Sequence, residues 1–311
     1  MEGVFFLLAQ LAESQHGLIT LEQLQQLGVS RRTLDRLLAT GRLVRVAPRV
    51  FLVHGAPVTW QRRLLAECLS AGSDALVSHR SAAALYGLDG FDQQRVVHLT
   101  VPRHRQPGKR ADVRVHRSPD YELIRRTTRQ RVPVTDAARL VLDLYASEPN
   151  PHVARRGLFS VRKKNLASWT ELFGCLEAHA RQGRRGIASL RADVDLYSRI
   201  GCPESTPEDS IHQLLVGAGL PEPHLQYRVT AAGRRYRFDL AYPDQRVGLE
   251  YKSKAHHLSD EAFDADPLRD ADLAIEGWIV IHITKAHLRN DPEGVVRRVK
   301  RALRRRGDVA A

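Results

Sequence analysis

The chain has 311 residues, which exceeds the roughly 100 to 200 residues typical of one domain, so we expect two or three domains. The sequence contains neither an apolar run long enough to cross a bilayer nor a basic segment followed by an apolar one at its start. This argues against a membrane-spanning or secreted protein. Lysine and arginine number 48 against 35 aspartates and glutamates, a net charge of +13 that is carried mostly by arginine. Because guanidinium groups suit phosphate and guanine recognition, the expected partner is a polyanion.

The three cysteines indicate a reducing compartment. Cys68, Cys175 and Cys202 are far apart and have no CxxC or cysteine/histidine spacing, which argues against a disulfide framework and against a zinc site built on them. We therefore expect a cytoplasmic protein.

The first 56 residues predict a winged helix-turn-helix domain. Apolar residues repeat at helical spacing over Val4–Leu11, before a break at His16-Gly17. Thr20–Gln23 then form a capping box that opens a second short helix, which ends near Gly28. A third helix follows after a tight turn that contains this glycine.

The third helix, between Ser30 and Gly41, has the features of a recognition helix, which presents its first residues to the major groove. The polar residues near its start are Arg31, Arg32, Thr33 and Arg36. Two strands, 42–46 and 50–53, predict the hairpin of the wing, which carries Arg45 and Arg49. We expect these six residues to contact DNA. The alternative is a small helical bundle whose arginines are only solvated.

Three short motifs mark this region: Gly17–Thr20, Leu27–Ser30 and Gly41–Val46. Together with segments 76–83 and 132–139, they resemble the winged-helix head and the second domain of the AbiEi family of antitoxins. Relatives carry a glycine before the aromatic residue of the wing, where this chain has Arg49-Val50-Phe51. The resemblance implies a DNA-binding repressor, often a homodimer on a palindrome, with a cognate toxin protein as a possible partner.

Residues 57–200 predict a mixed α/β middle domain. The expected helices lie around 64–69, 81–86, 136–145, 169–180 and 187–197, and the expected strands are 96–101 and 113–116. Ser78 and His79 are adjacent, but neighbouring side chains on a helix point about 100° apart. We therefore expect no hydrogen bond between them, take Ser78 as a helix cap and interpret His79 as a packed or partner-contacting residue rather than a base.

Residues 201–311 predict a third domain, again α/β. Ser205–Asp209 is a strong helix start, and Glu208 shares a helix face with Ile211 and Leu215, so its carboxylate leans toward the buried side. Strands are expected at 235–242, 247–253 and 278–284.

The first two of these strands carry the pattern Asp239-x10-Glu250-x-Lys252. Glu250 and Lys252 are two residues apart and project to the same side of a strand, and hairpin pairing brings Asp239 to the same neighbourhood. Phosphodiester hydrolysis needs paired carboxylates that hold Mg²⁺ or Mn²⁺ and a lysine beside the attacking water. An exposed hairpin of alternating charge is the alternative for so short a motif.

The segment from Glu208 to about Val299 resembles the PD-(D/E)xK nuclease superfamily and its Vsr-like branch. The resemblance implies a restriction-endonuclease-like α/β/α core in which Glu208, Asp239 and Glu250 bind the metal. In this arrangement the catalytic residues are Asp239, Glu250 and Lys252.

Further residues fit auxiliary positions of the same family: Lys254, His256 and His257. Many relatives have Glu-Tyr-Asp-Gly where this chain has Glu250–Ser253, so either Lys252 or Lys254 takes the part of the lysine. Asp266–Asp270 fits a later stretch of the family, which we interpret as a structural ion-pair cluster on a helix.

The segment 297–306 is strongly basic and predicts a helix that follows backbone phosphate, with a frayed, solvated tail as the alternative. Two functions fit the sequence. The chain is either a Mg²⁺-dependent DNA endonuclease targeted by its winged helix, or a repressor whose nuclease fold has become a binding or dimerisation module. Recognition of RNA or tRNA through the middle domain is a third.

Overall fold

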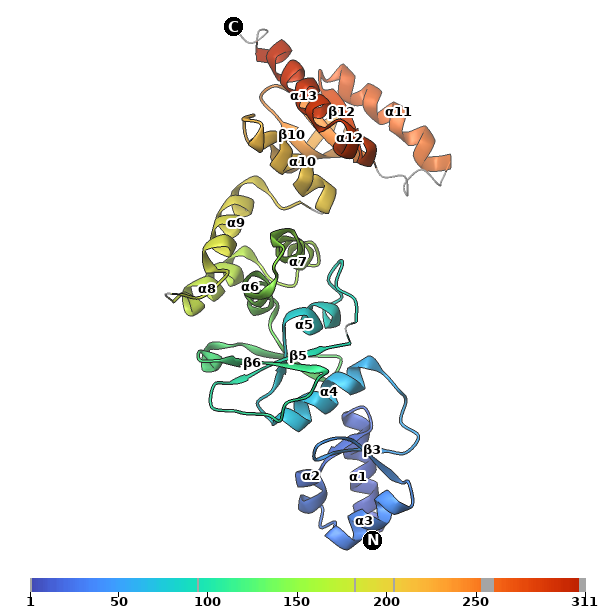
Figure 1. Ribbon diagram of the computed structural model, residues 1–311. Coiled ribbons are helices and arrows are strands. Elements are labelled where there is room, and N and C mark those ends of the chain that lie inside the picture. Colours follow the sequence, from blue (N-terminus) through green and yellow to red (C-terminus); the bar gives the residue numbers. More distant parts are fainter. Residues whose placement is uncertain (1, 94, 182, 204, 253–259, 308–311) are drawn as a thin grey trace. The chain divides into compact units, whose positions relative to one another are not determined.

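The computed structural model (Figure 1) describes residues 2–93, 95–181, 183–203, 205–252 and 260–307. The chain forms two compact units. Unit 1 comprises Met1–Val161 and Asn165–Arg191, and unit 2 comprises Arg162–Lys164 and Ala192–Ala311. No helix in the described part of the chain is both long enough and apolar enough to cross a membrane.

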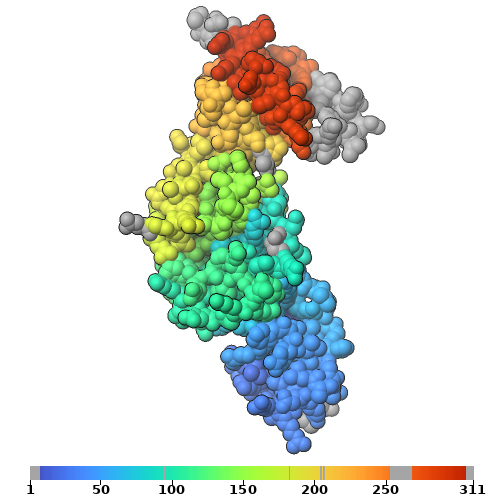
Figure 2. Space-filling model, in the orientation of Figure 1, coloured from blue at the N-terminus to red at the C-terminus, as the bar shows by residue number. Residues whose placement is uncertain are grey.

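Unit 1 begins with the expected winged helix-turn-helix, the blue region of Figure 2. Its elements are α1 (Glu2–Ser14), β1 (Leu18–Thr20), α2 (Leu21–Gln26), α3 (Arg31–Ala39), β2 (Leu43–Ala47) and β3 (Val50–Val53). The capping box of α2 and the Ser30 cap of α3 are both present. Strand β1, which the sequence did not predict, joins the wing in an antiparallel sheet of order β1-β3-β2. The helices pack on this sheet through a core that includes Leu24, Leu37 and Phe51.

The rest of unit 1 is built on a five-stranded mixed sheet of order β6-β5-β4-β8-β7. Its strands are β4 (Leu76–Val77), β5 (Val97–Pro102), β6 (Val113–Ser118), β7 (Arg126–Arg129) and β8 (Val132–Thr135). The pairs β5–β6 and β4–β8 are parallel, whereas β4–β5 and β7–β8 are antiparallel. Both predicted strands, β5 and β6, are confirmed, and the other three were not predicted.

The helices of this region confirm the five predicted ones and add α7. They are α4 (Trp60–Ala71), α5 (His79–Leu85), α6 (Ala137–Ser147), α7 (Pro151–Lys163), α8 (Trp169–His179) and α9 (Ile187–Ile200), with a 3-10 turn at Tyr121–Leu123. The end of α7 and the larger part of α9 are counted with unit 2. Helix α5 packs on α6 and on β5, so its first residue lies beside the sheet.

Unit 2 is a four-stranded mixed sheet with helices. Its elements are α10 (Thr206–Gly217), β9 (His224–Ala231), β10 (Arg234–Tyr242), β11 (Val247–Lys252), α11 (Asp260–Ile275), β12 (Ile279–Thr284), α12 (Lys285–Asn290) and α13 (Pro292–Gly307). The sheet order is β12-β11-β10-β9, in which β11 and β12 are parallel. Strand β9 was not predicted, while the three predicted strands and their neighbouring helices are confirmed. Phe238, Leu273 and Trp278 are central to the core.

Candidate DNA interface and candidate nuclease site

Helix α3 is amphipathic, with its basic residues on the exposed side. Leu34 and Leu37 are buried, whereas Arg31, Arg32 and Arg36 are exposed. The Thr33 N–H donates to Ser30 Oγ at 3.2 Å, which satisfies one of the free amides at the start of the helix. The first turn of α3 therefore presents cations and a capped helix end to solvent, a surface suited to an anion.

The wing places Arg49 at its tight turn with a backbone that L-residues rarely adopt. Its φ of +61° lies in the left-handed region. AbiEi relatives carry a glycine in this turn, before the aromatic residue of the wing. The Arg49 guanidinium pairs with Glu22 at 2.7 Å on the surface, and the guanidinium of exposed Arg45 lies 5.5 Å from the centre of the Phe51 ring.

Ser78 and His79 are hydrogen-bonded, which corrects our expectation. Ser78 Oγ and His79 Nδ1 are 2.9 Å apart, and both residues are buried. Ser78 occupies the cap position of α5, but its side chain makes no capping bond. The expectation assumed two consecutive helical residues, whereas Ser78 is extended and His79 has a φ of +52°, so the helical angle between side chains does not apply.

The hairpin of unit 2 brings the predicted acid-acid-lysine residues together. Continuing the register Leu240↔Leu249 by one residue puts Asp239 opposite Glu250, and the Tyr251 N–H donates to Asp239 Oδ2 at 2.8 Å. Lys252 Nζ lies 3.9 Å from Glu250 Oε2.

Glu250 is already paired with a residue of α11. Arg269 donates to both carboxylate oxygens, at 2.7 Å from Nη1 to Oε2 and more closely from Nη2 to Oε1. Burial raises the pKa of Glu250, although Arg269, Lys252 and His282 act to lower it. His282 Nε2 also lies 2.8 Å from Asp270 Oδ2. Arg269 and Asp270 thus contact side chains of the neighbouring strands β11 and β12, and the sequence did not indicate His282.

Glu208 faces inward as expected, beside fully buried Ile211 and Leu215. Ser205 Oγ donates to its Oε1 and Gln226 Nε2 to its Oε2, each at 2.6 Å. Within the described residues, the three acids expected to bind metal do not form a group of ligand atoms close enough to hold one ion. Lys254, His256 and His257 lie outside the described residues.

The basic segment near the chain's end is a packed helix rather than a frayed tail over the part that the structure describes. In α13, Val295 and Val299 are fully buried, so this side of the helix belongs to the core of unit 2. The opposite side carries exposed cations at Arg297, Lys300 and Arg301.

Residues 7–53 match the family described as transcriptional regulator, AbiEi antitoxin. Two uncharacterized proteins of Mycobacterium tuberculosis, MT2308 of strain CDC 1551 and Rv2248 of strain H37Rv, are each 27% identical to this chain over 296 residues. Each alignment covers 89% of this chain and 98% of the relative. The crystal structure of the RV2827C protein from the same species matches with a TM-score of 0.40 and 16% identity, over 73% of this chain and 88% of that one.

The match agrees with the resemblance drawn from the sequence for the winged helix. This region is similar to a regulator domain of AbiEi antitoxins, and the family description supports DNA binding. The nuclease resemblance of unit 2 rests on its residues alone.

Proposed function

We propose that this protein is a DNA-binding transcriptional regulator of the antitoxin type. The observation that carries the proposal is the helix α3, with buried leucines on one side and Arg31, Arg32 and Arg36 exposed on the other. The family match over residues 7–53 supports it. A cognate toxin protein and a homodimer on a palindromic operator belong to the same proposal.

In this proposal α3 enters the major groove, where its first residues reach base edges and phosphates. The wing arginines, Arg45 and Arg49, contact the adjacent backbone. A net charge of +13 favours encounter with DNA, and its electrostatic contribution to the binding free energy weakens as the salt concentration rises. Contacts that depend on sequence come from α3, and the remainder of the cationic surface adds affinity for any duplex.

The test is a binding titration with a duplex from upstream of the protein's own gene and with a scrambled duplex, each at several salt concentrations. Replacing Arg31, Arg32 and Arg36 with alanine should weaken binding to the upstream duplex by at least about tenfold. The salt slope should also become shallower, by about 1 for each arginine that pairs with a phosphate in the wild-type complex.

A matched variant removes the same charge from exposed positions in the middle of unit 1, by Arg95→Ala, Arg103→Ala and Arg117→Ala. It should retain the preference for the upstream duplex. Equal losses in the two triple variants would mean that charge alone governs binding, and would rule out α3 as the recognition helix.

A metal-dependent DNA endonuclease is the second candidate, favoured by the juxtaposition of Asp239, Glu250 and Lys252. In that role Asp239 and Glu250 would supply oxygen ligands to Mg²⁺ or Mn²⁺, whereas Glu208 lies too far from them to share one ion in this arrangement and already accepts from Ser205 and Gln226. Such an ion supplies charge neutralisation at the phosphate and a more acidic water. The donor atoms are of the right kind, but Arg269 holds both oxygens of Glu250 and has to release them first.

The residues of the chain have separate tasks in this second proposal. Lys252, 3.9 Å from Glu250, would hold its ammonium beside the attacked phosphate and orient the water. The exposed cations of α13 give the backbone of the duplex a further contact.

This candidate is tested by incubating supercoiled plasmid with the protein and Mg²⁺ or Mn²⁺. Nicking by the wild type should be abolished by Asp239→Asn and retained by Asp244→Asn, which changes an exposed acid in the turn of the same hairpin. Absence of nicking by the wild type, with DNA binding intact, would leave the regulator as the function of the whole chain.

A further inference from the structure

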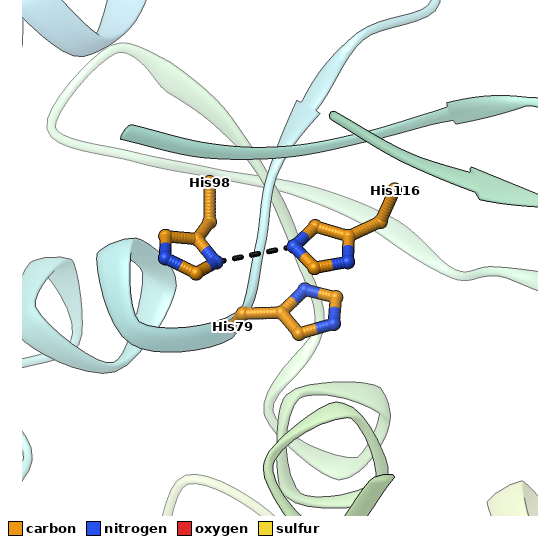
Figure 3. A group of neighbouring side chains, drawn as sticks. All are labelled: His79, His98 and His116. Atoms are coloured by element: carbon orange, nitrogen blue, oxygen red, sulfur yellow. Dashed lines mark hydrogen bonds between the residues drawn. The ribbon is translucent and has the colours of Figure 1, made fainter. Parts of the chain in front are cut away.

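Three histidines gather in unit 1 (Figure 3). His79 is the first residue of α5, while His98 and His116 lie on the neighbouring parallel strands β5 and β6. One ligand nitrogen from each ring lies within 4.8 Å of the others. Among the described residues this is the only group of three histidine, cysteine or acidic side chains that is close enough to hold a metal ion.

The rings are already neutral at physiological pH, as metal ligands must be. Burial lowers the pKa of His79 and of His116 to about 3 and that of His98 to about 4. The histidines also lower one another's pKa, with a further contribution from nearby arginines. The charged groups that act on the cluster are Arg80, Arg114, Arg139, Arg184, Asp143 and Glu148.

Two of these arginines are paired with acids, which offset part of the positive charge around the histidines. Arg80 donates twice to Glu148, at 2.7 and 2.6 Å, and Arg139 Nε donates to Asp143 Oδ1 at 2.8 Å. The other oxygen of Asp143, Oδ2, is buried and has no hydrogen-bond partner among the described residues. Because Asp143 also acts electrostatically on His116, a buried negative charge lies near the cluster.

The local backbone holds His79 in place for this arrangement. Its φ of +52° is costly for a residue with a side chain, and such strain is typical of positions where the surroundings fix a functional group. The contact between Ser78 Oγ and His79 Nδ1 orients the ring. Ser78 is fully buried, so the pair is better suited to holding a ligand than to attacking a substrate.

We propose that His79, His98 and His116 bind a divalent transition-metal ion, with Zn²⁺ as the best fit. Three imidazoles suit Zn²⁺, Co²⁺ or Ni²⁺ rather than Mg²⁺, so this site is chemically distinct from the acids of unit 2. Three protein ligands leave a fourth position open for water or for a group from a partner. His98 and His116 are only partly buried, which gives an ion a route from solvent.

The distances show what binding has to change. His98 Nδ1 and His116 Nε2 are 3.1 Å apart, close to the roughly 3.3 Å expected between two nitrogens about 2.0 Å from one tetrahedral zinc. The His79 ring is stacked on that of His116, with centroids 3.5 Å apart and an interplanar angle of 13°. Parallel rings do not aim their lone pairs at one point, so one ring of this stack rotates when the ion binds.

The test uses full-length protein freed of metal with a chelator. Co²⁺ should bind one ion per chain and give visible absorption bands of a nitrogen-coordinated ion, and Zn²⁺ should displace it in calorimetric titration. His98→Gln should weaken Zn²⁺ binding by more than about 100-fold, since loss of an outer-shell partner alone costs 10- to 100-fold. His104→Gln, at an exposed histidine, should bind as the wild type does.

Ser78→Ala provides a milder change, which should weaken Zn²⁺ by about 10- to 100-fold without removing a ligand. Circular dichroism of each variant establishes that it is folded. Failure of the wild type to bind Co²⁺ or Zn²⁺, or undiminished binding by folded His98→Gln, would overturn the proposal.

Discussion

Arg269 on α11 holds both carboxylate oxygens of Glu250 on β11, so the acid expected to bind a metal is neutralised by an arginine instead. Glu250 is buried and Arg269 is 22% exposed at its side chain, which places the pair where water screens it only in part. The ion pair ties the helix to the sheet of unit 2. Any metal at Glu250 has to compete with this partner.

Replacing Arg269 with methionine should destabilise unit 2 by about 3 kcal/mol at neutral pH, because it leaves a buried carboxylate without its partner. Burial already raises the pKa of Glu250, and removing Arg269 raises it further. At a pH between the ordinary pKa of glutamate and its raised pKa in the folded variant, the native state holds a proton that the unfolded state has lost. The free energy of unfolding therefore falls as the pH rises through this range. The loss should therefore be smaller at pH 5 than at pH 7.5.

Urea unfolding followed by Trp278 fluorescence measures this effect, in a Trp60→Phe, Trp169→Phe background that leaves one tryptophan in unit 2. The double change Arg269→Met, Glu250→Gln should recover much of the stability, because the amide carries no charge. The same loss at both pH values would contradict an electrostatic origin.

Arg49→Gly should stabilise the winged helix relative to Arg49→Ala by about 1 kcal/mol, because only glycine adopts a φ of +61° without a steric cost. Both variants lose the surface ion pair with Glu22, which is worth little at such exposure. Thermal unfolding of the pair gives the difference. In DNA titrations the two variants should lose equal affinity, since each lacks the guanidinium. Equal melting temperatures would show that backbone strain at residue 49 does not affect stability.

Gly248→Ala should destabilise unit 2 by about 2 kcal/mol, because an added Cβ would lie 2.3 Å from the buried ring of Phe238. Gly217→Ala offers a matched control at the last residue of α10, where nothing lies within 4 Å of the added methyl group. There alanine should be neutral or up to about 1 kcal/mol more stable. Denaturant midpoints compare the two, and a tolerated Gly248→Ala would show that β10 and β11 separate easily.

The histidine cluster should make metal-free unit 1 sensitive to acid. The folded-state pKa of His98, about 4, is below its ordinary value of 6.5, so between these values the unfolded chain binds a proton that the native state does not. Stability from this group is complete above pH 6.5 and is lost as pH falls, by about 2 kcal/mol between pH 7 and pH 5. Denaturation midpoints measured at pH 7 and pH 5 should show that His98→Gln loses less stability over this range than the wild type does. His104→Gln should lose as much as the wild type.

Sequence periodicity predicted the winged helix well because its signals are local. The capping hydroxyls of Thr20 and Ser30 lie within three residues of the amides they satisfy, and the wing strands are adjacent in sequence. The pairing of Asp239 and Glu250 followed for the same reason, since a short turn fixes the register of the hairpin.

What the sequence did not reveal depends on distant parts of the chain. Strands β4 and β1 are only two and three residues long, too short for an alternating pattern, and each forms by pairing with a later strand. The partner of Glu250 comes from 19 residues further on, through a helix whose docking no local pattern specifies. Three isolated histidines have no motif spacing, so only the assembled sheet brings them together.

The parallel pairing of β5 and β6 also has a consequence for how the chain folds. His79 and His98 are 19 residues apart and His98 and His116 are 18, so two short loops suffice to bring the three rings together. Closing such loops costs little entropy, and β4 can pair with β5 within the same stretch, whereas β8 joins β4 from more than fifty residues further along the chain. We expect residues 76–118 to form the earliest structured part of this sheet, and an ion captured there would act as a template for the strands that follow.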